Sequence, residues 1–212
     1  MTDKAIFNEL IQEGEMINPY FGQILENGID FVPYIGKLIQ TVKINRLIRR
    51  FKEHDKKINF ISHLAADSVL SSEYISQRIF PIIFSDLFEE HEDAKINLIL
   101  NGFENVFIEE NKNESVIINF YDMLRNLRYL DLKRLFYLAG LTEETITFVQ
   151  ESDVHGLIRN IDRRLENNGL LNIKKTWKDI GDSDSDKDRD DVEISLYGNK
   201  FLKFILEGDG LK

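Results

Sequence analysis

Apolar residues recur at helical spacing over most of the chain. In the clearest stretch they follow one another at intervals of three and four, at Ile96, Ile99, Leu100, Phe103, Val106 and Phe107. This interval places them on one face of an α-helix. A helix before it, from about Ser71 to Leu87, contains Pro81. Proline lacks an N–H and its ring crowds the preceding turn, which predicts a kink or a break near Phe80.

A polar interval divides the chain. Residues 109–115 read Glu-Glu-Asn-Lys-Asn-Glu-Ser and contain no apolar side chain. Such a composition is typical of a connection between packed elements. We therefore expect one helical domain over residues 1–112 and a second domain over residues 113–212.

The second domain has the sharpest pattern. A helix is expected to start with Ser152 or Asp153 as its N-cap and to end at Asn167-Asn168-Gly169, with apolar positions at Val154, Leu157, Ile158, Ile161 and Leu165. The period then changes to two, which predicts strands from Leu171 to Trp177 and from Val192 to Leu196. A long acidic loop joins them, and a closing helix follows. The fold class is therefore mainly α with one β-hairpin.

The end of this domain carries a recognisable order of elements. A helix ending in Arg163-Arg164-Leu165-Glu166-Asn167-Asn168-Gly169-Leu170-Leu171 is followed by the hairpin and by Ile194-Ser195-Leu196-Tyr197-Gly198-Asn199-Lys200-Phe201-Leu202. This order resembles a winged-helix domain over about Val116 to Leu206. Together with the helical periodicity before it, the resemblance leads us to expect an N-terminal helical domain plus a C-terminal winged-helix-like domain. Winged helices bind DNA or protein, so the fold does not choose the partner.

Three features along the whole chain carry a second resemblance. They are Phe31-Val32-Pro33-Tyr34-Ile35-Gly36 ahead of the basic stretch Arg46 to Arg50, the helix start Leu127-x-x-Leu130-Asp131-Leu132-Lys133, and the terminal winged-helix pattern. This layout is similar to that of bacterial Abi-alpha (abortive infection alpha) proteins, a phage-exclusion group. The resemblance implies a bacterial or prophage-borne cytoplasmic protein with a role in phage–host conflict.

Composition narrows the class of protein. The 212 residues are 42% hydrophobic and 30% charged, which is enough apolar material for a packed core. Cysteine is absent, which excludes disulfide frameworks, cysteine-ligated zinc and cysteine nucleophiles. The longest apolar run, Ile29 to Ile39, is interrupted by Lys37 and is shorter than the roughly 20 residues of a membrane span. We expect a soluble, cytoplasmic protein.

The formal net charge of −10 argues against binding of nucleic acid through overall charge, yet one segment is basic. Between Lys37 and Lys57 cations far outnumber acids. The candidate interaction residues there are Arg46, Arg49, Arg50, Lys52, Lys56 and Lys57. Two interpretations stay open. The segment is a contact surface for nucleic acid, anionic lipid or an acidic partner, or it neutralises acidic neighbours such as Glu89 to Asp93 within the fold.

A second set of candidate interaction residues lies on the presumed recognition helix. Its members are Arg159, Arg163 and Arg164, with Asn160 beside them. Such side chains contact phosphates and base edges in a major groove. Two features argue against DNA binding. Asp153, Asp162 and Glu166 share the helix, and the loop between the strands is rich in aspartate where a wing that approaches phosphates should be basic.

The sequence contains no motif for hydrolysis, nucleotide binding or histidine-ligated zinc. The loop Asp182 to Glu193 spaces its carboxylates like a calcium loop, but Lys187 stands where the turn glycine belongs. We therefore expect a non-enzyme without cofactor or metal that acts through macromolecular contacts. The resemblance to Abi-alpha proteins implies that it does so in phage defence (abortive infection) or phage–host conflict. A protein partner ranks ahead of nucleic acid. A membrane surface, contacted through the stretch Ile29 to Phe51, and self-association are further options. The alternative function is a winged-helix DNA-binding transcriptional regulator.

Overall fold

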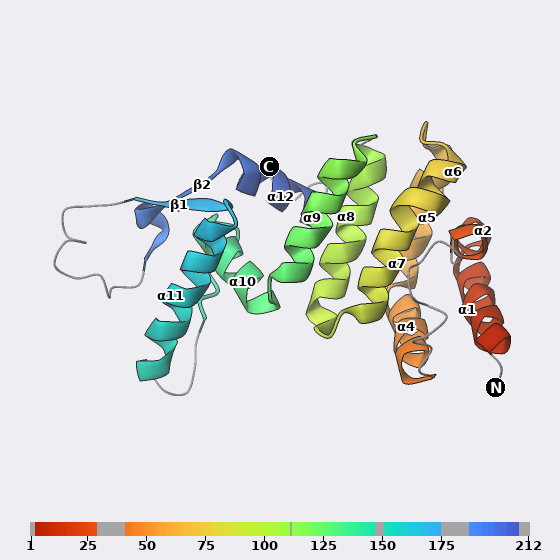
Figure 1. Ribbon diagram of the computed structural model, residues 1–212, viewed down its shortest axis with the longest axis horizontal. Coiled ribbons are helices and arrows are strands. Elements are labelled where there is room, and N and C mark those ends of the chain that lie inside the picture. The colour runs from red at the N-terminus through yellow and green to blue at the C-terminus, as the bar shows by residue number, and fades with distance from the viewer. Residues whose placement is uncertain (1–2, 29–40, 111, 147–150, 175–186, 208–212) are drawn as a thin grey trace. The chain divides into compact units, whose positions relative to one another are not determined.

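The computed structural model describes residues 3–28, 41–110, 112–146, 151–174 and 187–207 (Figure 1). The chain divides into two compact units. Unit 1 comprises residues 1–125 and 204–212, and unit 2 comprises residues 126–203. Both are built mainly from helices, and unit 2 also holds a two-stranded antiparallel sheet. The prediction of a mainly α protein with one β-hairpin is confirmed.

Unit 1 packs its helices around a core rich in phenylalanine. In chain order its elements are α1 (Asp3–Ile17), α2 (Pro19–Gly28), α4 (Thr41–Glu53), α5 (Asp55–Asp67), α6 (Ser72–Tyr74), the π-helix η2 (Ile75–Ile79), α7 (Phe80–Glu89), the 3₁₀-helix η3 (Asp93–Lys95), α8 (Ile96–Ile108) and α9 (Glu114–Asn126). Figure 1 shows α7, α8 and α9 side by side. The Phe21 ring lies edge to face against Phe51 and Phe80, with centroids 5.2 and 6.2 Å apart.

The interruption expected near Phe80 is a change of winding. The π-helix η2 ends at Ile79, and α7 continues with Pro81 as its second residue. Proline has no N–H to continue the hydrogen-bond ladder of a helix, and the wider π turn just before it accommodates this interruption. The helix expected over residues 96–107 is α8, and its apolar face is buried.

The two units divide between Arg125 and Asn126, later than the boundary expected after residue 112. The helix after the polar interval, α9, belongs to unit 1 because it is fastened there by specific contacts. The Tyr121 hydroxyl donates to the Ile99 carbonyl oxygen (3.1 Å), and Arg125 Nη2 lies 2.7 Å from Asp86 Oδ1. Residues 109–115 are thus a turn inside unit 1. A polar interval marks a loop, but its composition does not show whether the loop joins two helices of one unit or two units.

Unit 2 contains α10 (Tyr129–Leu138), α11 (Glu151–Asn167), β1 (Leu171–Ile173), the 3₁₀-helix η5 (Arg189–Asp191), β2 (Val192–Ile194) and most of α12 (Leu196–Ile205). In the hairpin, Leu171 is paired with Ile194 and Ile173 with Val192. The end of α11 is as expected. Gly169 has a φ of 71°, and its N–H and that of Leu170 donate to the carbonyl groups of Glu166 and Leu165 (2.8 and 3.0 Å). Its start differs, because Ser152 and Asp153 lie inside a helix that begins at Glu151.

The second strand is shorter than the alternation of Val192, Ile194 and Leu196 predicted. It ends at Ile194, and Leu196 is the first residue of α12, where it is 76% exposed. The cause is Ser195, whose Oγ accepts the Gly198 N–H (2.8 Å) and so caps α12. Residues 175–186, with Trp177 and the first half of the acidic loop, lie outside the described residues, as do residues 29–40 with the Phe31–Gly36 segment.

Candidate macromolecular contact surfaces

Arg50 is the innermost cation of the basic segment. Its side chain is 1% exposed, and its guanidinium donates to the carbonyl oxygens of Leu87 (2.6 Å) and Glu90 (2.8 Å) and to Asp93 Oδ1 (2.7 Å). The last carbonyl groups of a helix lack partners within the helix. Arg50 therefore caps the C-terminal end of α7, where a cation is also favoured by the helix dipole.

Lys43 and Arg46 act on the same end of α7. Lys43 Nζ contacts both carboxylate oxygens of Glu89 (2.8 and 2.6 Å) and lies 5.3 Å from the centroid of the Phe88 ring. Arg46 Nη2 donates to the Phe88 carbonyl oxygen (3.3 Å). Positions 43, 46 and 50 share one side of α4. This side of the helix is therefore used to neutralise and cap α7 within unit 1.

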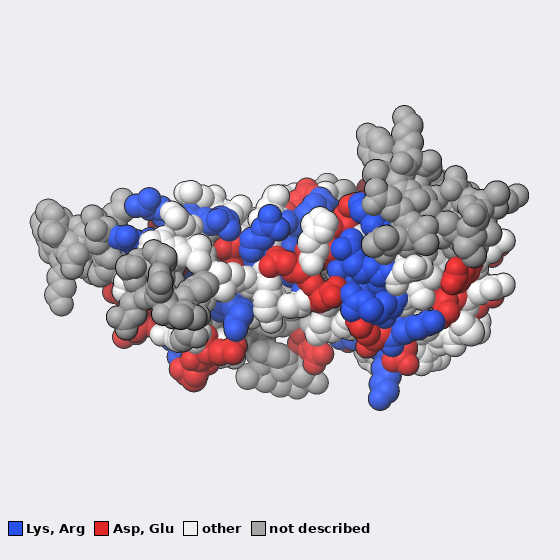
Figure 2. Space-filling view, turned by 90° about the horizontal axis from the view of Figure 1, so that it is seen from below, with Lys and Arg blue, Asp and Glu red and all other residues white. Residues whose placement is uncertain are grey.

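Arg49 and Lys52 lie on the outer side of α4. Arg49 contacts Glu53 and Asp93, each at 2.8 Å. The hydrogen bonds that Asp93 accepts from Arg49 and Arg50 hold the pKa of Asp93 below its usual range. Lys52 Nζ lies 2.9 Å from Glu13 Oε1 of α1. Figure 2 shows the resulting mixture of basic and acidic side chains on this face of unit 1.

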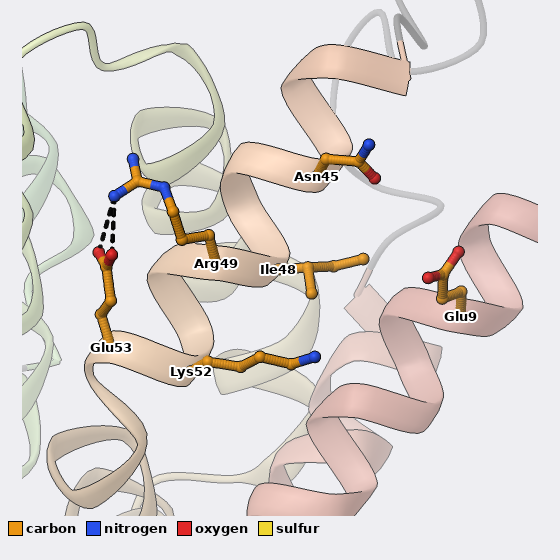
Figure 3. A pocket seen from close by; sticks show the side chains of 6 residues that line it. All are labelled: Glu9, Asn45, Ile48, Arg49, Lys52 and Glu53. Atoms are coloured by element: carbon orange, nitrogen blue, oxygen red, sulfur yellow. Dashed lines mark hydrogen bonds and ion pairs between the residues drawn. The ribbon is translucent and has the colours of Figure 1, made fainter.

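An open groove of about 440 Å³ lies between α1 and α4 (Figure 3). Its lining residues are Glu9, Asn45, Ile48, Arg49, Lys52 and Glu53. Both cations in this lining are already paired with carboxylates, and Figure 3 shows Glu9 on the opposite side of the groove, with the Arg49 guanidinium turned away from it toward Glu53. The groove therefore offers no excess of one charge that would select an anionic or a cationic ligand.

The remaining candidates in this segment are Lys56 and Lys57 at the start of α5. Lys57 pairs with Glu104 and lies 3.9 Å from Glu207 Oε1. Lys56 is exposed and makes no ion pair within the described part of the chain. The apolar side of α4 is buried as well, since Leu47 and Phe51 are at most 1% exposed. Contact with a membrane through this side would require α4 to leave the core. None of the helices in the described ranges has the length and apolar character needed to cross a membrane.

Two acidic side chains of α11, Asp162 and Glu166, are engaged within unit 2. Asp162 is 2% exposed and faces α10, where Arg134 Nε and Nη2 donate to its two carboxylate oxygens at 2.8 and 2.9 Å. Glu166 Oε1 accepts the N–H of Ile173, the last residue of β1 (3.2 Å). Two of the three acidic residues that argued against DNA binding are thus occupied inside unit 2. The side chain of the third, Asp153, lies outside the described residues.

The outer face of α11 carries amides and cations. From residue 155 to residue 167, the exposed side chains are His155, Asn160, Arg163 and Asn167. Arg159 is half-buried, and Arg164 Nη1 contacts Asp131 Oδ2 (2.7 Å) while remaining 42% exposed. Arg163 is the cation of this set that makes no ion pair within the described residues. The spacing of 160, 163 and 167 places these three on one face.

A cluster around Tyr137 was not expected from the sequence. Tyr137 donates its hydroxyl hydrogen to Asp188 Oδ1 (2.8 Å), which raises the pKa of Tyr137 and lowers the pKa of Asp188. Arg189 donates from Nε to the Tyr137 carbonyl oxygen (2.7 Å) and lies 4.4 Å from the ring centroid. Arg134 also donates to the Lys187 carbonyl oxygen. The end of the acidic loop that leads into β2 is therefore fastened to α10. The signal for this cluster in the sequence is Arg189, a cation within an acidic run.

In the parts of the chain that the structure describes, no three histidine or carboxylate side chains come together to hold a metal ion. Residues 182–186, the start of the loop compared with a calcium site, lie outside them. The likeness to Abi-alpha and winged-helix proteins is one of sequence features. No protein-family model, curated protein or solved structure matches this chain.

Proposed function

We propose that this chain is a non-enzymatic protein that acts through macromolecular contact, and that the exposed face of α11 binds double-stranded DNA. The observation that carries the proposal is the placement of the charged and amide side chains over residues 155–167 of α11. Its acidic residues Asp162 and Glu166 are engaged inside unit 2, whereas Asn160 and Arg163 are exposed. The helix thus presents outward the side-chain types that contact phosphates and base edges.

The geometry of B-DNA fits such a face. The major groove admits one α-helix, arginine pairs with guanine in two hydrogen bonds, and asparagine pairs with adenine in the same way. The chain as a whole carries a net charge of −10, so long-range attraction to phosphates does not assist binding. We therefore expect affinity to depend on a few local contacts and to vary with base sequence.

The biological setting that we propose is phage defence or phage–host conflict, and its support is the resemblance to Abi-alpha proteins. Within this setting, the exposed side chains of α11 favour the role of a DNA-binding transcriptional regulator. A protein partner on the same face is the competing proposal. If the exposed face of α11 does not bind DNA, the protein partner remains as the proposal.

The test is fluorescence anisotropy with a labelled duplex selected by the protein from a random pool, at low and at near-physiological salt. We expect saturable binding that Arg163→Ala weakens by about 1–3 kcal/mol on the selected site. Asn160→Ala should relax the base preference. The matched control is Lys56→Ala, which removes an exposed cation from unit 1.

Two outcomes would contradict the proposal. One is an absence of saturable binding at low salt. The other is a loss of affinity on Lys56→Ala that equals or exceeds the loss on Arg163→Ala, because it would move the contact to the basic segment of unit 1.

A further inference from the structure

Residues of α8 hold the C-terminal end of α12. Asn105 Nδ2 donates to the carbonyl oxygens of Phe204 and Leu206, both at 2.8 Å, and Asn101 Nδ2 donates to that of Ile205 (3.0 Å). Both asparagines are almost fully buried. The final carbonyl groups of a helix need partners from outside it. Two amides from a segment about a hundred residues earlier supply them here.

An aromatic seat lies beside these amides. The Phe204 ring packs with its centroid 5.0 Å from that of Phe120 and 5.2 Å from that of Tyr121. It lies against Gly102, where a Cβ atom would stand 2.7 Å from Phe204 Cε1. Glycine in the middle of a helix lowers helix stability, so the close approach of the ring gives a physical reason for this residue in α8.

The residues of α8 that hold the end of α12 favour its release. The run Asn101-Gly102-Phe103-Glu104-Asn105 places buried polar groups in a helix whose other buried residues are apolar, and Asn101 Oδ1 is buried without a hydrogen-bond partner. Buried polar groups are costly unless they are bonded, and water can bond them once the seat is uncovered. The ends of helices fray and open at lower free energy than the centre of a core helix. Leu206 and Glu207, which end the described chain, are not buried.

We propose that the strip Asn101–Asn105, with Phe120 and Tyr121, is a binding site for the C-terminal end of an apolar helix, and that Phe204–Leu206 of the same chain occupies it as a releasable clasp. The chain passes between the units twice, at 125/126 and at 203/204. Opening of the clasp leaves unit 2 attached through the first passage alone. This inference does not depend on DNA binding by α11.

Hydrogen exchange tests release. In the unmodified chain, amides of residues 202–206 should exchange about tenfold faster than those at the centre of α8, because they open locally. Gly102→Ala should increase their exchange further, since the new methyl group displaces the Phe204 ring. The matched control is Gly156→Ala in α11, where a Cβ would meet nothing within 4 Å. Exchange of residues 202–206 at the rate of the α8 core in both the unmodified chain and Gly102→Ala would overturn the proposal.

A labelled peptide of residues 196–207, added to the full chain, tests the binding site itself. The unmodified chain should bind it weakly, because its own α12 end occupies the seat. Phe204→Ala should bind it about tenfold more tightly, by freeing the seat. Adding Asn105→Leu should abolish this gain. If Phe204→Ala does not fold, Phe204→Leu takes its place. Absence of binding by the folded variant would refute the site, and equal binding by the variant and the unmodified chain would refute its occupation by α12.

Discussion

Replacing Arg50 with methionine tests whether this residue caps α7 inside unit 1 or is available to contact a partner. The change removes the donors for the Leu87 and Glu90 carbonyl oxygens and for Asp93. Water can solvate Asp93, whose side chain is 53% exposed, but the Leu87 contact is buried. Removing one partner of a buried charged contact costs about 3–5 kcal/mol. Since one of the three acceptors regains water, we expect a loss of about 3 kcal/mol in the free energy of unfolding.

The assay is urea unfolding followed by far-ultraviolet circular dichroism. With a denaturant slope of about 2 kcal/mol/M, the midpoint of Arg50→Met should fall by about 1.5 M. Arg49→Met is the matched control, because it removes a cation with the same partner, Asp93, from the exposed side of α4. Its midpoint should stay within experimental error of the unmodified chain. An equally small change in both variants would refute the capping role and make Arg50 available to a partner.

Burial raises the pKa of Asp86 to about 6 despite its pairing with Arg125. The folded state therefore binds this proton more tightly than the unfolded state. The free energy of unfolding should fall as pH rises from about 4 to about 6, by up to about 3 kcal/mol from this group. Asp86→Asn should lack this part of the pH profile in urea titrations, and an unchanged profile would contradict the assignment. Among the glycines, Gly156→Ala should raise the thermal midpoint, since helix propensity gains about 0.5–1 kcal/mol. Gly198→Ala should lower it, because its methyl group overlaps the Leu170 carbonyl oxygen, at about 1–3 kcal/mol. Shifts of the same sign in the two variants would show that local space does not control these positions.

Local sequence patterns were sufficient to predict an element where the contacts that determine it are close in sequence. The helix over residues 96–107 follows from its spacing, and the end of α11 follows from Gly169, whose positive φ suits glycine. Ser195 was missed because the alternation of apolar residues continues through Leu196. Its capping bond to the Gly198 N–H is also local. The spacing Ser-x-x-Gly favours a helix start here, whereas the alternation of apolar residues favours a longer strand.

Contacts between residues that are distant in sequence could not be predicted from local patterns. A run of cations does not reveal that Arg50 turns inward while Arg49 turns outward, since that depends on where the end of α7 lies. The charge of Asp162 likewise weighed against DNA binding until its partner Arg134, on another helix, was known. The number of charges can be counted from the sequence, but their directions depend on tertiary packing.

The insertion of unit 2 between two parts of unit 1 sets an order on folding during synthesis. Domains generally fold as they emerge from the ribosome, from the N-terminus onward. Unit 1 is made through residue 125 long before residues 204–207, so the seat on α8 is formed while its occupant is still unmade. For that interval the side-chain amides of Asn101 and Asn105 lack the carbonyl partners that residues 204–206 later provide. Unit 1 is completed by the last described residues of the chain, after all of unit 2 has been translated.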